Sequence, residues 1–225
     1  MLRRKGRSAD QRGAVIVEAA LIFPLLFLIV FGSLEYGLLF KDQLTASNAV
    51  RAGGRALSAQ SGKYADQAAI QAMLPAAASF NGGLSKVTRV VVYFATCANP
   101  TGPPTATASR CGASPPIKKL SQIAPGGLQC IPRARTVGVP DHCNIYAGDN
   151  LKDAFANNNG KWGCIDSPKS PDDWWCPETR TTSQSAGTDY VGVHIEYEHE
   201  WVTKLFGTKR DMADDVIFRV EPQGV

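Results

Sequence analysis

The sequence predicts an α+β fold anchored in a membrane, and three observations support this prediction. An apolar segment at residues 14–40 follows a basic leader, β-branched segments occur at residues 86–95 and 190–203, and a cysteine-rich stretch at residues 97–187 lies between these two. The expected fold has a long N-terminal transmembrane helix that continues into a juxtamembrane helix, followed by a second helix. A small antiparallel three-stranded sheet carrying a long disulfide-rich insertion completes it.

The apolar segment reads AVIVEAALIFPLLFLIVFGSLEYGLLF and is charged only at Glu18 and Glu35. As a helix rising about 1.5 Å per residue it measures roughly 40 Å, more than the ~30 Å hydrocarbon layer. Secretory signal peptides have a shorter apolar region, of about 7 to 15 residues, before a small-residue cleavage site. The length therefore favours a permanent membrane span, and a cut between Thr45 and Ser47 is the alternative.

The net charge of +4 is concentrated in front of the apolar segment. The leader, residues 1–13, contains one acid, Asp10, and five basic residues: Arg3, Arg4, Lys5, Arg7 and Arg12. The positive-inside rule places this leader in the cytoplasm and residues 41–225 outside. The remaining chain is neutral, which argues against nucleic-acid binding because that function needs a basic surface.

The helix is expected to continue out of the membrane to about Ala59, and a second helix is expected from Tyr64 to Phe80, because both segments are rich in Ala and other helix formers. Leu44, Val50 and Leu57 recur near helical spacing. They predict a weakly apolar face that docks against the rest of the domain.

Three strands are expected. Residues 86–95 are β-branched and aromatic, and Tyr190–Thr203 alternates between apolar and polar residues, with His194 on the polar, solvated face. Asp215–Glu221 is the third strand, and residues 204–214 are its hairpin connection. Within the insertion only Asp149–Asn158 has a helical pattern.

The insertion contains all six cysteines of the chain. An even number of cysteines outside the cytoplasm predicts three disulfides, whose pairing the sequence leaves open. None of the spacings is C-x-x-C, so neither the paired ligands of a zinc site nor a thioredoxin-like motif occurs. The cysteines are Cys97, Cys111, Cys130, Cys143, Cys164 and Cys176.

The run RGAVIVEAALIFPLLFLIVFGSLEYG, residues 12–37, resembles the N-terminal signature of the TadE-like family of tight-adherence (Flp) type IV pilus systems. The shared features are Arg-Gly, an apolar pair, Val-Glu, a proline within the helix and an acidic-aromatic-Gly exit. Residues 48–58, NAVRAGGRALS, resemble the juxtamembrane segment of that family. Expected partners are therefore the membrane, other pilins and pseudopilins, a prepilin peptidase and the pilus assembly machinery.

The resemblance also implies roles for individual residues in a pilin-like subunit. A prepilin peptidase would cut between Gly13 and Ala14, and Glu18 would pair with the new N-terminal amine of a neighbouring subunit. Pro24 is interpreted either as a kink that helps subunits pack or as a mild bend without a role. Major pilins of this system usually have Glu-Tyr where this chain has Glu18-Ala19, and their bodies are far shorter, so a minor pseudopilin is expected.

No catalytic or cofactor motif appears, and neither enzymatic activity nor a metal site is expected. His194 and His199 are five residues apart on a strand, so they point to opposite faces and cannot share one ion. The adjacent Trp174 and Trp175 are interpreted as a small core under the disulfides. The alternatives are a permanently anchored surface protein that binds a ligand through the insertion, and an anchored extracellular enzyme.

Overall fold

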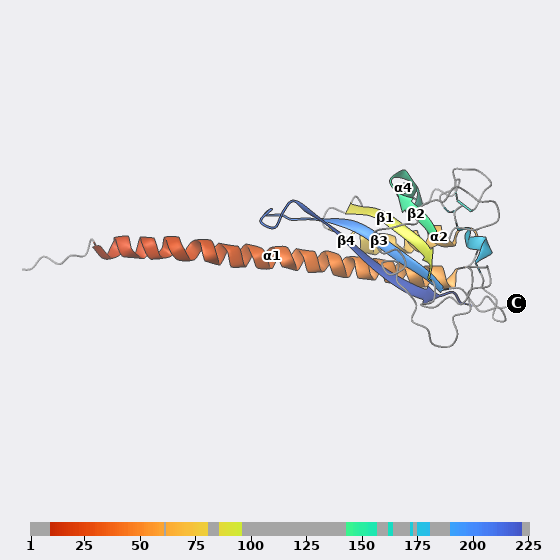
Figure 1. Cartoon of the computed structure of the whole chain (residues 1–225), viewed down its shortest axis with the longest axis horizontal. Helices are drawn as coiled ribbons and strands as arrows, with labels where there is room; N and C mark the ends of the chain where they lie inside the picture. Colours follow the sequence, from red (N-terminus) through yellow and green to blue (C-terminus); the bar gives the residue numbers. More distant parts are fainter. Residues whose placement is uncertain are drawn as a thin grey trace, which may run out of the picture.

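One long helix runs along most of the described part of the molecule (Figure 1). The computed structural model of the chain describes residues 10–60, 62–80, 86–95, 143–156, 162–163, 172, 175–180 and 190–221. Helix α1, Asp10–Ala59, is 50 residues long and contains Pro24 without ending there. Its N-terminal part stands free, whereas its C-terminal part packs against the other elements (Figure 1). The predicted continuation of the apolar helix to Ala59 is confirmed.

The second helix, α2 (Ala65–Ala77), packs against the C-terminal part of α1. Two glycines of α1 permit close packing. A Cβ atom on Gly53 would lie 2.7 Å from Cγ of Met73 in α2, and one on Gly54 would lie 2.3 Å from the ring of Phe218 in the last strand of the sheet. Val50 and Leu57 are buried, as the helical spacing predicts. Leu44 is exposed, because it lies on the side of α1 that faces away from this contact.

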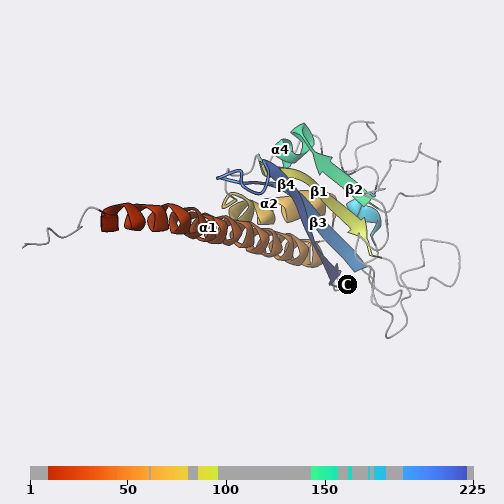
Figure 2. The same cartoon turned by 60° about the vertical axis from the view of Figure 1, so that its left-hand side comes forward.

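The sheet is antiparallel and has four strands in the order β2-β1-β3-β4 (Figure 2). They are β1 Val87–Phe94, β2 Cys143–Ala147, β3 Tyr190–Glu200 and β4 Lys209–Arg219. The prediction of three strands is therefore wrong. The short strand β2 lies within the segment predicted as an irregular insertion, and it pairs with β1 from Arg89 opposite Ala147 to Tyr93 opposite Cys143.

Strand β4 begins at Lys209, six residues before the predicted start, so most of the predicted hairpin connection is strand. Its first residues are charged and resemble a loop in sequence, but they pair with β3 along its whole length, from Glu200 opposite Lys209 to Tyr190 opposite Arg219. Helix α4, Asp149–Phe155, confirms the helical pattern predicted within the insertion. A short 3-10 helix, η3, spans Pro177–Thr179.

The main core lies between the sheet and the two long helices. Val90 and Val92 of β1 and Val193 and Ile195 of β3 are fully buried on this face. Full burial of such a side chain stabilises the fold by about 1.5–3 kcal/mol. The helices contribute mainly small side chains here, which lets them approach the sheet closely: Ala46, Ala49, Ala69 and Ala77.

The opposite face of the sheet carries a smaller buried cluster of Val91, Tyr93 and Ala95. The ring of Tyr93 lies over Gly192 of β3, where an added Cβ would come within 2.1 Å of it. His194 is also on this face and is only 7 % exposed, so its predicted position on a solvated surface is wrong. Burial lowers the pKa of the His194 imidazole, and nearby Glu196 and Asp215 oppose this shift.

Candidate functional site

The free part of α1 presents an apolar surface. Its side chains from Val15 to Phe31 are mostly exposed, and Leu21 is 75 % exposed. Phe23, Phe27 and Phe31 follow one another at the i,i+4 spacing, with ring centroids 6.1 and 6.0 Å apart. Among the described residues, α1 is the one helix that is long enough and apolar enough to cross a membrane. Its surface therefore suits contact with lipid or with other apolar helices.

The residues predicted to take part in cleavage and assembly all lie on this free part of α1. Gly13 and Ala14 are exposed and helical, and nothing lies within 4 Å of a Cβ atom added to Gly13. The Glu18 side chain is exposed and makes no hydrogen bond or ion pair with the described residues. The structure thus leaves Gly13, Ala14 and Glu18 accessible along α1.

A buried carboxylate marks the place where α1 meets the sheet. Glu35 is completely buried, and its carboxylate accepts hydrogen bonds from the backbone N–H groups of Val202, at 3.1 Å, and Thr203. These two donors belong to the connection between β3 and β4, residues 201–208, which we call the hairpin tip. Hydrogen bonds to a charged acceptor are about twice as strong as neutral ones, so Glu35 holds the hairpin tip against the helix.

Two further contacts join the next turns of α1 to β3. The Asp42 carboxylate lies 2.7 Å from Nδ1 of buried His199, and the Tyr197 hydroxyl donates to the Gln43 side chain at 3.1 Å. Burial, followed by the charges of Asp42 and Asp214, raises the pKa of the Tyr197 phenol. The phenol therefore remains a hydrogen-bond donor at neutral pH. His194 and His199 lie on opposite faces of β3, as expected.

A second buried charge cluster connects the insertion to α2. Asp66 of α2 accepts two hydrogen bonds from the Arg180 guanidinium, one from Asn144 at 2.7 Å and one from the Tyr146 hydroxyl at 2.6 Å. We call these four residues the Asp66 cluster. Burial, then the Asp66 charge, raises the pKa of the Tyr146 phenol. All four groups are buried and mutually bonded, which is the pattern of a structural network.

The Asp66 cluster also fixes Trp175. The indole is 5 % exposed and belongs to the main core, and the Arg180 guanidinium lies 4.0 Å from its ring centroid. Asn144 accepts from the Trp175 backbone N–H at 2.7 Å and donates to its carbonyl at 2.8 Å. The interpretation of Trp175 as a core residue is confirmed, and Trp174 lies outside the described residues.

Two of the predicted disulfide cysteines, Cys143 and Cys176, are described. Both are half-buried and disulfide-bonded. Cys97, Cys111, Cys130 and Cys164 lie outside the described residues, as does His142. The set of three disulfides therefore stays a prediction.

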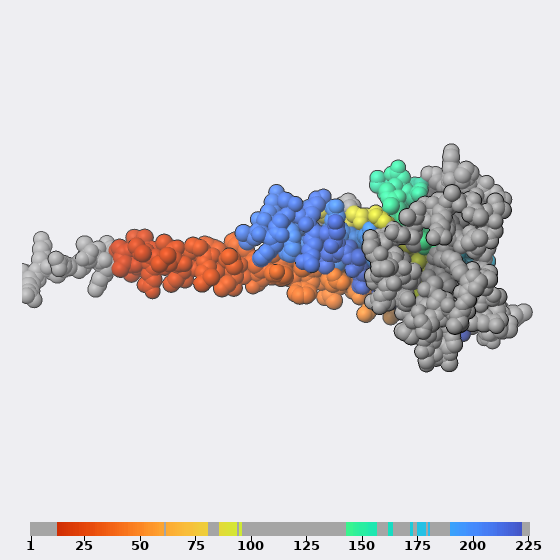
Figure 3. Space-filling view, viewed as in Figure 1, coloured from red at the N-terminus to blue at the C-terminus, as the bar shows by residue number. Residues whose placement is uncertain are grey.

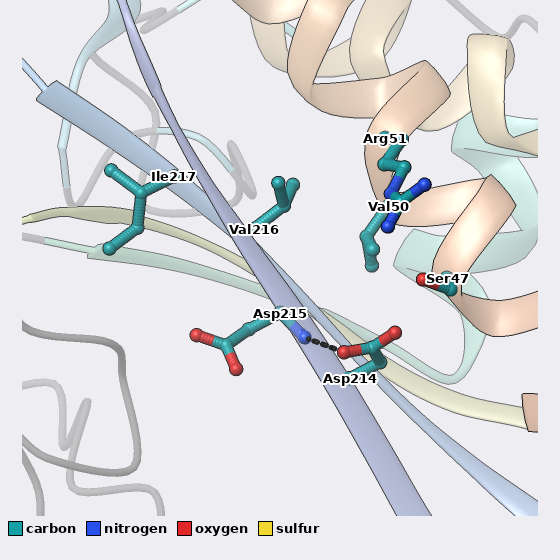
Figure 4. A pocket seen from close by; sticks show the side chains of 7 residues that line it. All are labelled: Ser47, Val50, Arg51, Asp214, Asp215, Val216 and Ile217. Carbon is teal, nitrogen blue, oxygen red and sulfur yellow. Dashed lines mark hydrogen bonds between the residues drawn. The ribbon is translucent and has the colours of Figure 1, made fainter.

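An open cavity of about 450 Å³ lies between α1 and the edge strand β4 (Figure 4). The helix and strand side chains form opposite walls, with Arg51 on the helix and Asp214 on the strand. The Asp215 backbone N–H donates to the Asp214 carboxylate at 2.9 Å. In the described parts of the chain, no group of three or more His, Cys, Asp or Glu is placed to hold a metal ion. The lining residues are Ser47, Val50, Arg51, Asp214, Asp215, Val216 and Ile217.

Sequence reasoning missed the buried polar residues that join α1 to the sheet and the insertion to α2. Glu35 stood out as one of only two charges in the apolar segment, but its partners are backbone groups more than 160 residues away. Asp42, His199, Asp66 and Arg180 gave no local signal, because each is explained only by its tertiary partner.

One of three comparisons with known proteins agrees with the resemblance in the sequence. The family described as TadE-like protein matches residues 13–55. The match covers the free part of α1, the Glu35 and Asp42 contacts and the close approach at Gly53 and Gly54. A search of curated proteins and a search of solved structures each return no match.

Proposed function

We propose that this chain is a minor pseudopilin of a Flp (Tad) type pilus, a structural subunit rather than an enzyme. It is anchored by α1 with residues 1–13 in the cytoplasm and the sheet outside. The observation that carries the proposal is the TadE-like match, which begins at residue 13, where the predicted cleavage site lies, and extends along the free helix. The exposed apolar surface of residues 14–34 supports packing against the helices of other pilins.

In this proposal a prepilin peptidase removes residues 1–13 and leaves Ala14 as the new N-terminus. Gly13 is exposed with open space around its Cα, which supports access by a peptidase. The exposed Glu18 carboxylate, one helical turn further on, then pairs with the Ala14 amine of a neighbouring subunit. A charge near the membrane interface is costly unless it is paired or hydrated, so assembly gives Glu18 a partner.

The first experiment determines the N-terminal residue of the protein purified from its native membrane. Ala14 is the expected result, together with its loss in a Gly13→Leu variant. Gly37→Leu is the matched control, since Gly37 is also an exposed glycine of α1 with nothing near its Cα, and its processing stays normal. Met1 as the mature N-terminus refutes the processing step and favours a permanently anchored surface protein. A start near Ser47 indicates a secretory signal.

The second experiment tests assembly apart from processing. Glu18→Gln keeps the size of the side chain and removes its charge, so cleavage after Gly13 continues while co-purification with sheared pili falls. Glu18→Asp, which keeps the charge, is the control. Equal amounts of the Glu18→Gln variant and of the unchanged protein in pili count against the pairing with Ala14.

A further inference from the structure

The hairpin tip lies beside α1, nearer to the N-terminus of the helix than the rest of the sheet does. A Cβ atom added to Gly32 would lie 3.8 Å from the ring of Phe206, and the Tyr36 ring lies 5.4 Å from that of Phe206 and 6.2 Å from that of Trp201. The hairpin of β3 and β4 extends toward the free part of the helix beyond the other strands (Figure 3). The tip is therefore held at the level of residues 32–36.

Exposed apolar side chains of the sheet domain are concentrated in this tip. Past Leu44, the large hydrophobic residues that are exposed among the described residues are Tyr64, Val202, Leu205 and Phe206. Three of these four belong to the hairpin tip. A soluble surface normally scatters such residues singly, and a contiguous group marks an interaction site.

Basic side chains accompany the apolar ones. Lys204 is exposed at the turn, with a positive φ of 59°, and exposed Lys209 follows where β4 begins. Lys209 also pairs with Glu198 at 2.8 Å. Lysine lets its apolar stem lie along a hydrophobic layer while its ammonium group stays in water, and exposed aromatic residues such as Tyr36 favour the same boundary.

The level of the hairpin tip coincides with the expected edge of the bilayer. A helix needs about 20 residues to cross the hydrocarbon layer, so a span that begins at Ala14 ends near Leu34. Glu35, the first charge beyond that point, is the residue that binds the tip. The half-exposed rings of Tyr36 and Phe206 would therefore lie where headgroups meet acyl chains, with buried Trp201 packed beside them.

We infer that the hairpin tip is a second membrane contact, whose partner is the headgroup layer of the leaflet from which α1 emerges. Val202, Leu205 and Phe206 enter the boundary of the acyl chains, and Lys204 faces the lipid phosphates. This inference rests on the membrane span in the proposed function. Because Glu35 fixes the tip to the helix, the two contacts together set the angle of the sheet domain above the membrane.

Photocrosslinking tests this contact on the full chain. The photoreactive analogue p-benzoylphenylalanine replaces Phe206, which it resembles in shape, in protein reconstituted into vesicles of phosphatidylethanolamine and phosphatidylglycerol. Tyr64, an exposed aromatic residue far from the tip in the sequence, is replaced in the matched control, and Leu25 is replaced to report on the membrane span. The expected result is a lipid adduct from the Phe206 and Leu25 positions, several-fold above that from the Tyr64 position.

Three outcomes overturn the inference. A lipid adduct at the Leu25 position without one at the Phe206 position leaves the membrane span intact and removes the second contact. A protein adduct at the Phe206 position instead of a lipid adduct, with this chain or with another protein in native membranes, assigns the tip to a protein partner. No lipid adduct at either position refutes the membrane span itself, and with it the proposed anchoring. In the supporting case, Lys204→Glu lowers the adduct yield at the Phe206 position in these anionic vesicles.

Discussion

Replacing Arg180 by Met should destabilise the sheet domain severely. Met keeps much of the apolar stem of Arg and removes the guanidinium, so the Asp66 carboxylate loses two hydrogen bonds and its balancing charge. The Arg180 side chain is 4 % exposed and the Asp66 side chain 1 %, so water does not replace the lost partner. Only the neutral donors of Asn144 and Tyr146 remain. Breaking a buried pair in this way costs about 3–5 kcal/mol.

An exposed ion pair in the same chain provides the control for this loss of stability. Lys152 contacts Asp149 at 3.3 Å, and both side chains are more than four-fifths exposed. Such surface pairs contribute roughly 0–1 kcal/mol, so Lys152→Met should be nearly neutral. Native domains are stable by about 5–15 kcal/mol, and the Arg180→Met loss is therefore a large part of the total.

Urea unfolding of the full chain in mild detergent measures this difference. Near-ultraviolet circular dichroism reports the unfolding, because aromatic rings are packed in this region. The ring centroids of Tyr146 and Trp162 lie 5.1 Å apart, and the Trp175 ring lies under the Arg180 guanidinium. Asp66→Asn alone should also be costly, whereas the double variant should lose less than the sum of the single losses, since the buried charges are removed together. If Arg180→Met costs no more than Lys152→Met, the Asp66 cluster does not stabilise the fold.

Three other changes have defined outcomes. Because the pKa of His194 in the folded protein lies below its unfolded value of about 6.5, the unfolded chain binds the extra proton first, and stability should fall as the pH drops below that value. In His194→Gln the urea midpoint should therefore fall less between pH 7.5 and 5.5 than in the unchanged protein. An equal fall in both proteins would refute this. Gly54→Ala should cost about 1–3 kcal/mol in the same assay, because its Cβ would overlap the Phe218 ring, whereas Gly37→Ala should not destabilise, so similar losses would dismiss the close packing. Glu35→Gln should speed hydrogen exchange at the hairpin-tip amides relative to those of β1, and unchanged exchange would show that another group holds the tip.

Local composition was enough to predict the two longest apolar strands, although the structure buries side chains on both faces of each. The strand at residues 86–95 is confirmed, since its β-branched and aromatic run favours a strand, and so is the first part of Tyr190–Thr203, where apolar and polar residues alternate. Strand β2 was missed because five residues, CNIYA, are too short to show a period. The start of β4 was missed because KRDMAD is polar, and its strand conformation depends on pairing with β3 rather than on burial.

Only the exposed candidate residues have a local signal in the sequence. Gly13, Ala14 and Glu18 form a local signature, and the TadE-like match starts within it. The polar contacts that join helix, sheet and insertion are distant in sequence, and nothing in the surroundings of Asp66 or Asp42 distinguishes them from ordinary helix-surface acids. His194 was placed in water for the same reason, since neighbouring Glu196 and Glu198 made its face look fully polar.

The continuity of α1 has a mechanical consequence. The helix runs about 75 Å, at 1.5 Å per residue, without a break between the free apolar part and the part that packs on the sheet. A pull or a twist applied near Ala14 is therefore transmitted to the sheet domain along one helix, with Pro24 as the point where its hydrogen bonding is interrupted. Successive residues of a helix are rotated by about 100°, so one residue added before Gly32, where the contacts with the sheet begin, would turn the whole sheet domain relative to the N-terminal part of α1.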